Sequence, residues 1–138
     1  MIFTMIAIVV AWSLLDWVLY GSSWVQRAVY ARMDSAIWTP PRPGESTSGA
    51  QRRTMMTSVI ITIFSGIMFS IFGEWSGLAG LSWKTALAVA GLLWAVFVVP
   101  TAVSDRLYFR VGTRYTMLQL FAGAFKIAAA CVIFALRQ

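Results

Sequence analysis

Residues 55–72 read MMTSVIITIFSGIMFSIF, an apolar stretch without a single charged side chain. At about 1.5 Å of rise per residue, an α-helix of this length nearly matches the ~30 Å hydrocarbon core of a bilayer. Lipid offers the backbone no hydrogen-bond partners, so a lipid-embedded segment of this kind must be helical. The stretch therefore predicts a membrane-spanning helix, and this prediction decides the class of the whole protein.

Three further apolar runs of similar length accompany this one. They cover 2–20, which is broken only by Asp16, then 85–103, and then 117–136, which is broken only by Lys126. The first run lacks the basic start and the small-residue cleavage site of a secretory signal peptide, so we expect it to be retained as a helix. The sequence thus predicts a single all-α domain over residues 1–138, a polytopic membrane protein built as a four-transmembrane-helix bundle.

The composition supports this class and excludes others. Hydrophobic residues make up 59% of the 138 positions, charged residues only 12%, and the mean hydropathy is +0.76. A soluble domain usually carries roughly 25% charged residues, and disordered chains are more polar still. The chain has no histidine and a single cysteine, Cys131, so the usual ligand sets of zinc, haem and non-haem iron are missing. We therefore expect no metal, no cofactor and no Ser–His or Cys–His catalytic pair.

Basic residues concentrate in two of the connections between the apolar runs. Eight of the eleven lysines and arginines lie within 21–54 and 104–116, and the net charge is +6. By the positive-inside rule, these loops face the cytoplasm and both termini lie outside a bacterial inner membrane. Because the basic residues flank apolar runs, we expect them to contact anionic lipid rather than nucleic acid. The expected headgroup contacts are Arg27, Arg32, Arg52, Arg53, Arg106, Arg110 and Arg114.

The loops contain a short amphipathic segment and a linker. Within 23–38, apolar residues recur at helical spacing, at Trp24, Val25, Ala28, Val29, Met33 and Ile37. This pattern predicts a short interfacial helix in the headgroup layer of the cytoplasmic side. The proline-rich stretch that follows, 39–50, is predicted to be a linker. In the short loop 73–84, we expect Glu74 and Lys84 to form a solvated pair.

Asp16 and Lys126 are the two charged residues that fall inside the apolar runs. Such a group costs several kcal/mol in a bilayer unless it is paired or faces a cavity. Their depths differ by about 7 Å, which a lysine side chain can bridge, so an ion pair is expected where the first and last helices touch. One interpretation is a buried bridge that fixes helix register. The other is a polar pocket open to the cytoplasm, beside a kink at Pro100. The candidate residues of this site are Asp16, Tyr20, Gln119, Lys126, Thr101 and Asp105.

Several short segments resemble the DUF1761 family of bacterial four-helix membrane proteins. They are Leu15–Gly21 (LDWVLYG) with the later Trp24, Tyr30 and Trp38, then Gly91-Leu92-Leu93, Val99-Pro100-Thr101 and Leu107-Tyr108-Phe109. The resemblance covers most of the chain apart from 40–53 and implies the four-helix membrane fold. Lys126 departs from the family pattern, in which a histidine often stands near this position, so any role of that position would use a different ionisable group here. The family brings no established activity, so the resemblance leaves the function open.

The residues leave three functions open. A non-catalytic accessory or lipid-interacting membrane protein is favoured, because no catalytic constellation stands out and one face is strongly basic. A small proton-coupled transporter would use the membrane-embedded carboxylate of Asp16. An intramembrane enzyme acting on a lipophilic substrate would use Asp16, Tyr20 and Lys126 as acid and base groups. A homo-oligomer or a partner membrane protein is compatible with each of the three.

Overall fold

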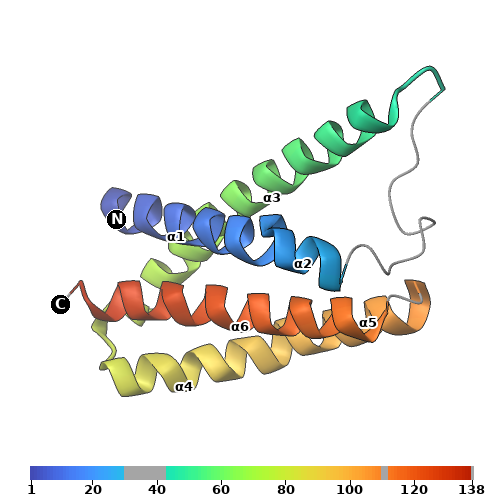
Figure 1. The fold of residues 1–138 in the computed structure, drawn as a ribbon. Helices are drawn as coiled ribbons and strands as arrows, with labels where there is room; N and C mark the ends of the chain where they lie inside the picture. Colours follow the sequence, from blue (N-terminus) through green and yellow to red (C-terminus); the bar gives the residue numbers. More distant parts are fainter. Residues whose placement is uncertain (30–42, 110–111, 138) are drawn as a thin grey trace.

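The computed structural model describes residues 1–29, 43–109 and 112–137, and within these ranges the chain forms helices and no strands (Figure 1). The elements are α1 (Ile2–Gly21), α2 (Ser23–Ala28), α3 (Thr47–Trp75), η3 (Leu78–Gly80), α4 (Trp83–Leu93), η4 (Trp94–Val98), α5 (Val99–Phe109) and α6 (Thr113–Ala135). Four helical segments are long and apolar enough to cross a membrane, namely Ile2–Val25, Ser48–Trp75, Trp83–Leu107 and Thr113–Ala135. The prediction of four long apolar helices is therefore confirmed.

Several helices extend beyond the apolar runs that predict them. α3 begins at Thr47 rather than 55, so the last part of the predicted loop 21–54 is helical. α5 continues to Phe109 and α6 begins at Thr113, so little remains of the predicted loop 104–116. Hydropathy marks the part of a helix that lipid can cover, whereas the helix itself continues as far as its backbone groups find partners.

The predicted interfacial helix over 23–38 falls only partly within the described residues. In the described part of this range, residues 23–28 form the short helix α2, which is capped by Ser22, whose Oγ accepts a hydrogen bond from the Val25 N–H at 3.4 Å. The part of this helix from residue 30 onward lies outside the described residues, and so do Arg32 and Arg110.

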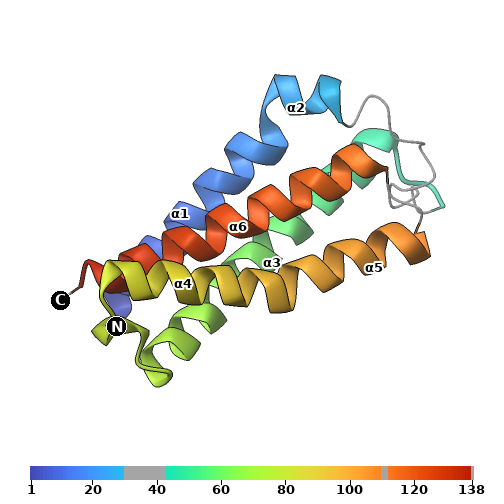
Figure 2. The same cartoon turned by 90° about the horizontal axis from the view of Figure 1, so that it is seen from below.

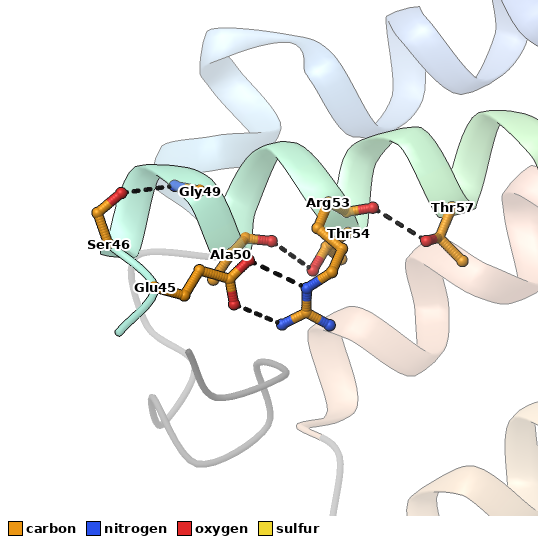
Figure 3. A network of polar contacts seen from close by, with 7 residues as sticks. All are labelled: Glu45, Ser46, Gly49, Ala50, Arg53, Thr54 and Thr57. Carbon is orange, nitrogen blue, oxygen red and sulfur yellow. Dashed lines mark hydrogen bonds and ion pairs between the residues drawn. The ribbon is translucent and has the colours of Figure 1, made fainter. Parts of the chain in front are cut away.

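The N-terminus of α3 shows why this helix extends into a polar loop (Figure 3). Ser46 is the N-cap, and its Oγ accepts a hydrogen bond from the Gly49 N–H at 3.1 Å. Glu45 accepts two hydrogen bonds from the Arg53 guanidinium, at 3.2 and 3.0 Å. An N-cap of this kind stabilises a helix by about 1 kcal/mol. The bidentate pair adds a charge-assisted contact across the first two turns.

α6 is the central helix of the molecule. It packs against α1, α4, η4 and α5, whereas α3 packs mainly on α1 (Figures 1 and 2). α3 crosses α1 obliquely, so its N-terminal half leads away from the other helices (Figure 1). The two termini lie at the same end of the molecule in both views. The helices thus stand in the order α3, α1, α6 and α4–α5, with the first and last apolar helices in contact as expected.

The core lies where α1, α4 and α6 meet, and glycines allow the helices to come close. Ile8 and Phe134 are fully buried there. A side chain at Gly73 would overlap the ring of Phe134, and a Cβ at Gly123 would lie 2.5 Å from Val98. Small residues at such contacts are typical of helices that pack in membranes, where close van der Waals packing replaces the hydrophobic effect.

Pro100 changes the helix type locally without ending the helix. A proline has no N–H, so the preceding turn loses a regular backbone hydrogen bond. The chain forms the π-helical turn η4 just before it, in which the Val99 N–H bonds to the Trp94 carbonyl. The predicted kink therefore takes the form of a π-turn, and α4, η4 and α5 continue as one apolar helical segment (Figure 2).

We expect Gly73→Ala to lower the thermal stability of the detergent-solubilised protein, because the added methyl group overlaps the buried ring of Phe134. Overpacking of this kind typically costs ~1–3 kcal/mol. Gly91→Ala is the matched control, since a Cβ on this helical glycine meets nothing within 4 Å and alanine is the better helix former. The measurement is the unfolding midpoint of each variant, and equal midpoints would contradict the packing at Gly73.

Candidate functional site

Asp16 of α1 and Lys126 of α6 form an ion pair between the two helices. Lys126 Nζ lies 2.5 Å from Asp16 Oδ1, and the two side chains are 20% and 19% exposed. The pair forms because α1 packs against α6 and because the lysine side chain covers the offset in depth. Lys126 Nζ also lies 5.9 Å from the ring centroid of Trp12, where the indole face attracts a cation. The predicted Asp16–Lys126 contact is confirmed.

Thr62 of α3 joins this ion pair, although it is not among the predicted site residues. Its Oγ1 donates a hydrogen bond to Asp16 Oδ2 at 2.6 Å, and the residue is 7% exposed. A signal that identifies it is the spacing of small and polar residues along α3, where Thr62, Gly66, Ser70 and Gly73 recur every three or four positions and are all buried. Such spacing marks one face of a helix. One oxygen of the Asp16 carboxylate is thus ion-paired with α6 and the other is hydrogen-bonded to α3.

Two tryptophans hold α6 through its backbone. Trp12 of α1 donates from Nε1 to the Lys126 carbonyl at 2.6 Å, and Trp94 of η4 donates from Nε1 to the Leu120 carbonyl at 2.8 Å. A largely buried indole N–H usually has such a partner, because leaving it unbonded in an apolar environment is costly. Since the two indoles come from different neighbours, they position α6 relative to both α1 and the α4–α5 segment. In the sequence, each of these helix-positioning residues can be recognised as a tryptophan in the middle of an apolar run.

Three of the other candidate residues, Gln119, Asp105 and Thr101, lie apart from the ion pair. Gln119 Nε2 donates to Asp105 Oδ2 at 3.1 Å, which links α6 to α5. Gln119 precedes Lys126 by two helical turns, about 10 Å along α6. Thr101 is exposed, and its hydroxyl donates to the Phe97 carbonyl of the same helical segment at 2.7 Å. The structure therefore does not gather the six candidate residues into one pocket.

The cluster of Asp16, Lys126 and Thr62 is suited to holding helices together. The charge of Lys126 balances that of Asp16, and each carboxylate oxygen has a partner. Tyr20 lies one turn beyond Asp16, near the end of α1. In the part of the chain that the structure describes, no group of three or more His, Cys, Asp or Glu residues could hold a metal ion. Acid–base chemistry at Asp16 would first require one of its bonds to open.

Arginine side chains collect at one end of the molecule, here termed the basic end. It comprises the ends of α2 and α5 and the beginnings of α3 and α6, which lie toward the same end in Figures 1 and 2. Its described arginines are Arg27, Arg52, Arg53, Arg106 and Arg114. Arg53 is held by Glu45, and Arg114 Nη1 donates to the Ala28 carbonyl at 3.0 Å. Apart from Arg53, these arginines are exposed.

The opposite end carries both termini and an ion pair that differs from the expected one. Glu74 pairs with Arg137, which follows α6, whereas Lys84 Nζ lies 5.7 Å from the ring centroid of Trp83. The prediction of a Glu74–Lys84 pair is therefore wrong. The physical reason is the close packing of Gly73 on α6, which brings the end of α3 beside the end of α6.

No family model, curated protein or solved structure matches this chain. No function can be transferred from a relative, so the function has to be inferred from the contacts themselves. The resemblance to the DUF1761 family stays a prediction. Two features carry the functional reasoning, namely the polar cluster of α1, α3 and α6 and the basic end.

We expect Asp16→Asn and Lys126→Met each to destabilise the protein and the double variant to recover much of the loss. Each single change leaves one partly buried charge without its partner, at a cost of about 1–3 kcal/mol. The double variant removes both charges together. The measurement is a double-mutant cycle on the unfolding free energies of the four proteins in detergent. If the loss of unfolding free energy in the double variant equals the sum of the two single losses, Asp16 and Lys126 do not stabilise one another.

Proposed function

We propose that this chain is a multi-pass integral membrane protein with its four apolar helical segments across the bilayer. The supporting observation is how little of each helix the protein itself covers. Only 17–28% of the apolar window of each segment is buried against the rest of the chain. Side chains such as Ile60, Phe64 and Phe121 are exposed. In water so large an apolar surface would cause aggregation, whereas lipid chains cover it readily.

The basic end faces the cytoplasm in this proposal, and both termini lie outside a bacterial inner membrane. The support is the positive-inside rule applied to the exposed arginines at that end. At the opposite end the described basic side chains are Lys84 and Arg137, and Arg137 is paired with Glu74. α2 lies at the basic end with Trp24 exposed, as is typical of an aromatic residue at the headgroup level.

Within the membrane the protein acts as a non-catalytic, lipid-interacting accessory factor. This proposal rests on one observation, namely that the pair of charges inside the apolar runs and the exposed charges lie in different parts of the molecule. The two charged groups inside the apolar runs, Asp16 and Lys126, are paired with each other, while exposed arginines gather at the basic end. Guanidinium groups match phosphate in both charge and hydrogen-bond geometry, so an anionic headgroup is the ligand class that fits this end.

Proton-coupled transport is the second candidate function. It is favoured by the residual exposure of the Asp16 and Lys126 side chains, about a fifth of each, which shows that the protein does not seal the pair on every side. Proton exchange at Asp16 would require Lys126 to move away. An intramembrane enzyme that uses Asp16, Tyr20 and Lys126 has less support, because Asp16 and Lys126 are bonded to each other.

The proposed orientation predicts which residues a membrane-impermeant maleimide reaches in intact bacterial cells. Ser76→Cys is expected to be labelled from outside, because Ser76 is exposed at the end that carries the termini. The matched change Ser23→Cys, exposed at the basic end, is expected to react only after permeabilisation. Cys131 is fully buried and gives the unlabelled background. The opposite pattern would overturn the orientation, and labelling of both positions from outside would contradict an odd number of crossings between them.

The proposed lipid interaction predicts that arginines select anionic lipid. A variant with Arg27, Arg52 and Arg106 changed to Gln is expected to retain less phosphatidylglycerol from mixed vesicles with phosphatidylcholine. We expect a loss of about 1 kcal/mol for each arginine. Lysines at the same positions are the control and should preserve most of the selectivity. The measurement is the ratio of the two lipids that co-purify with the protein.

The same vesicles distinguish the second candidate function. A pH-sensitive dye trapped inside them reports proton entry. A proton flux that Asp16→Asn abolishes, in a variant that still unfolds cooperatively, would establish transport. Such a result, together with unchanged lipid selectivity in the arginine variant, would overturn the accessory function.

A further inference from the structure

Asp105 of α5 differs from the other acidic side chains that the structure describes, because no cation is paired with it. Asp16, Glu45 and Glu74 each form an ion pair with a lysine or an arginine. Asp105 Oδ2 accepts a hydrogen bond from Gln119 Nε2 of α6 at 3.1 Å, but this amide is neutral, and its own oxygen is buried without a hydrogen-bond partner. Within the described residues, the contact of α5 with α6 therefore carries an unbalanced negative charge.

Asp105 lies where apolar surface meets the basic end. It stands two residues before the end of the apolar segment Trp83–Leu107, and α5 ends at the basic end (Figures 1 and 2). The nearby apolar side chains Val103 and Leu107 are 45% and 71% exposed. In the proposed membrane setting, lipid covers such side chains, so the carboxylate lies at the level where hydrocarbon gives way to headgroups. A ligand that reaches Asp105 at this level is expected to be amphiphilic.

The next residue, Arg106, supplies the opposite charge on the same helix. It is exposed, and successive residues leave a helix about 100° apart, so one group that lies along the surface of α5 can contact both side chains. A phosphate suits the guanidinium. An ammonium suits the carboxylate, which already accepts one N–H bond and can accept more. The two adjacent charges thus complement a zwitterionic headgroup.

The choice between zwitterionic headgroups follows from their hydrogen-bond donors. A primary ammonium has three N–H donors, as in lysine, whereas the choline nitrogen carries no hydrogen. We propose that the carboxylate of Asp105 binds the primary ammonium of phosphatidylethanolamine, with the lipid phosphate at Arg106. This inference rests on the proposed lipid-interacting function and gives it a site that distinguishes between headgroups of equal net charge.

The test is native mass spectrometry of the full chain in detergent, titrated with phosphatidylethanolamine and, separately, with phosphatidylcholine of the same acyl chains. The unchanged protein is expected to bind the first phosphatidylethanolamine about tenfold more tightly, as one charge-assisted hydrogen bond would give. Asp105→Asn is expected to remove this preference. Asparagine can still accept the bond from Gln119, so the link between α5 and α6 is kept, and an unchanged unfolding midpoint of the variant verifies this.

Glu45→Gln is the matched control. It also removes one negative charge at the basic end, but from a carboxylate that is already paired with Arg53, so the preference should stay. Asp105→Glu keeps the charge and should retain much of the preference. The proposal is overturned if the unchanged protein binds both lipids equally, if Asp105→Asn keeps the preference, or if Glu45→Gln loses it as well. Free ethanolamine that binds as tightly as the lipid would identify a soluble amine as the ligand and would likewise overturn it.

The outcomes also separate this inference from the broader proposed function, because phosphatidylglycerol has no ammonium. If changing Arg27, Arg52 and Arg106 abolishes the selectivity for phosphatidylglycerol while the unchanged protein binds phosphatidylethanolamine and phosphatidylcholine equally, the Asp105 site fails and the broader function stands. If the preference for phosphatidylethanolamine depends on Asp105 while the triple variant keeps its selectivity for phosphatidylglycerol, the Asp105 site stands and the general arginine contact fails.

Discussion

In the proposed membrane setting, lipid offers a polar group no hydrogen-bond partner, and this constraint accounts for the contacts that hold the described helices together. A charged or N–H group placed in hydrocarbon must find its partner within the protein. Asp16 and Lys126 meet the requirement through each other and through Thr62. Trp12 and Trp94 meet it by donating to carbonyls of α6. Since the partners belong to different helices, satisfying each group also fixes where the helices lie.

The same constraint explains how much of the fold could be predicted. Four long apolar runs are visible in the sequence, and the contact of Asp16 with Lys126 follows from counting depth along two of them. The ends of the helices could not be predicted in this way. α3 begins before its apolar run because Ser46 caps it and Glu45 binds Arg53, and these are local contacts that hydropathy does not register.

The candidate site could be predicted only in part. The position of a residue along an apolar run gives its depth, but it does not give the neighbouring helix that its side chain meets. Gln119 shares a side of α6 with Lys126, yet it bonds to Asp105 on a different neighbouring helix. Thr101 is near the expected kink, but its hydroxyl is used within its own helical segment. Thr62 carries no charge and attracts no notice in an apolar run, although its spacing with glycine and serine marks the packed face. Which neighbour each face meets is decided by the packing of whole helices.

The length of α3 has a consequence for how the protein would sit in different bilayers. Its 29 residues form a helix of about 43 Å, longer than the ~30 Å hydrocarbon core. A helix that exceeds the local thickness tilts, and the tilt increases as the bilayer thins. α3 lies close against α1 at Gly66, where a Cβ would lie 3.0 Å from Val9, one turn from the bond of Thr62 to Asp16. This crossing is the pivot of any such tilt, so a change in membrane thickness would move the end of α3 that carries Arg52 and Arg53 the most.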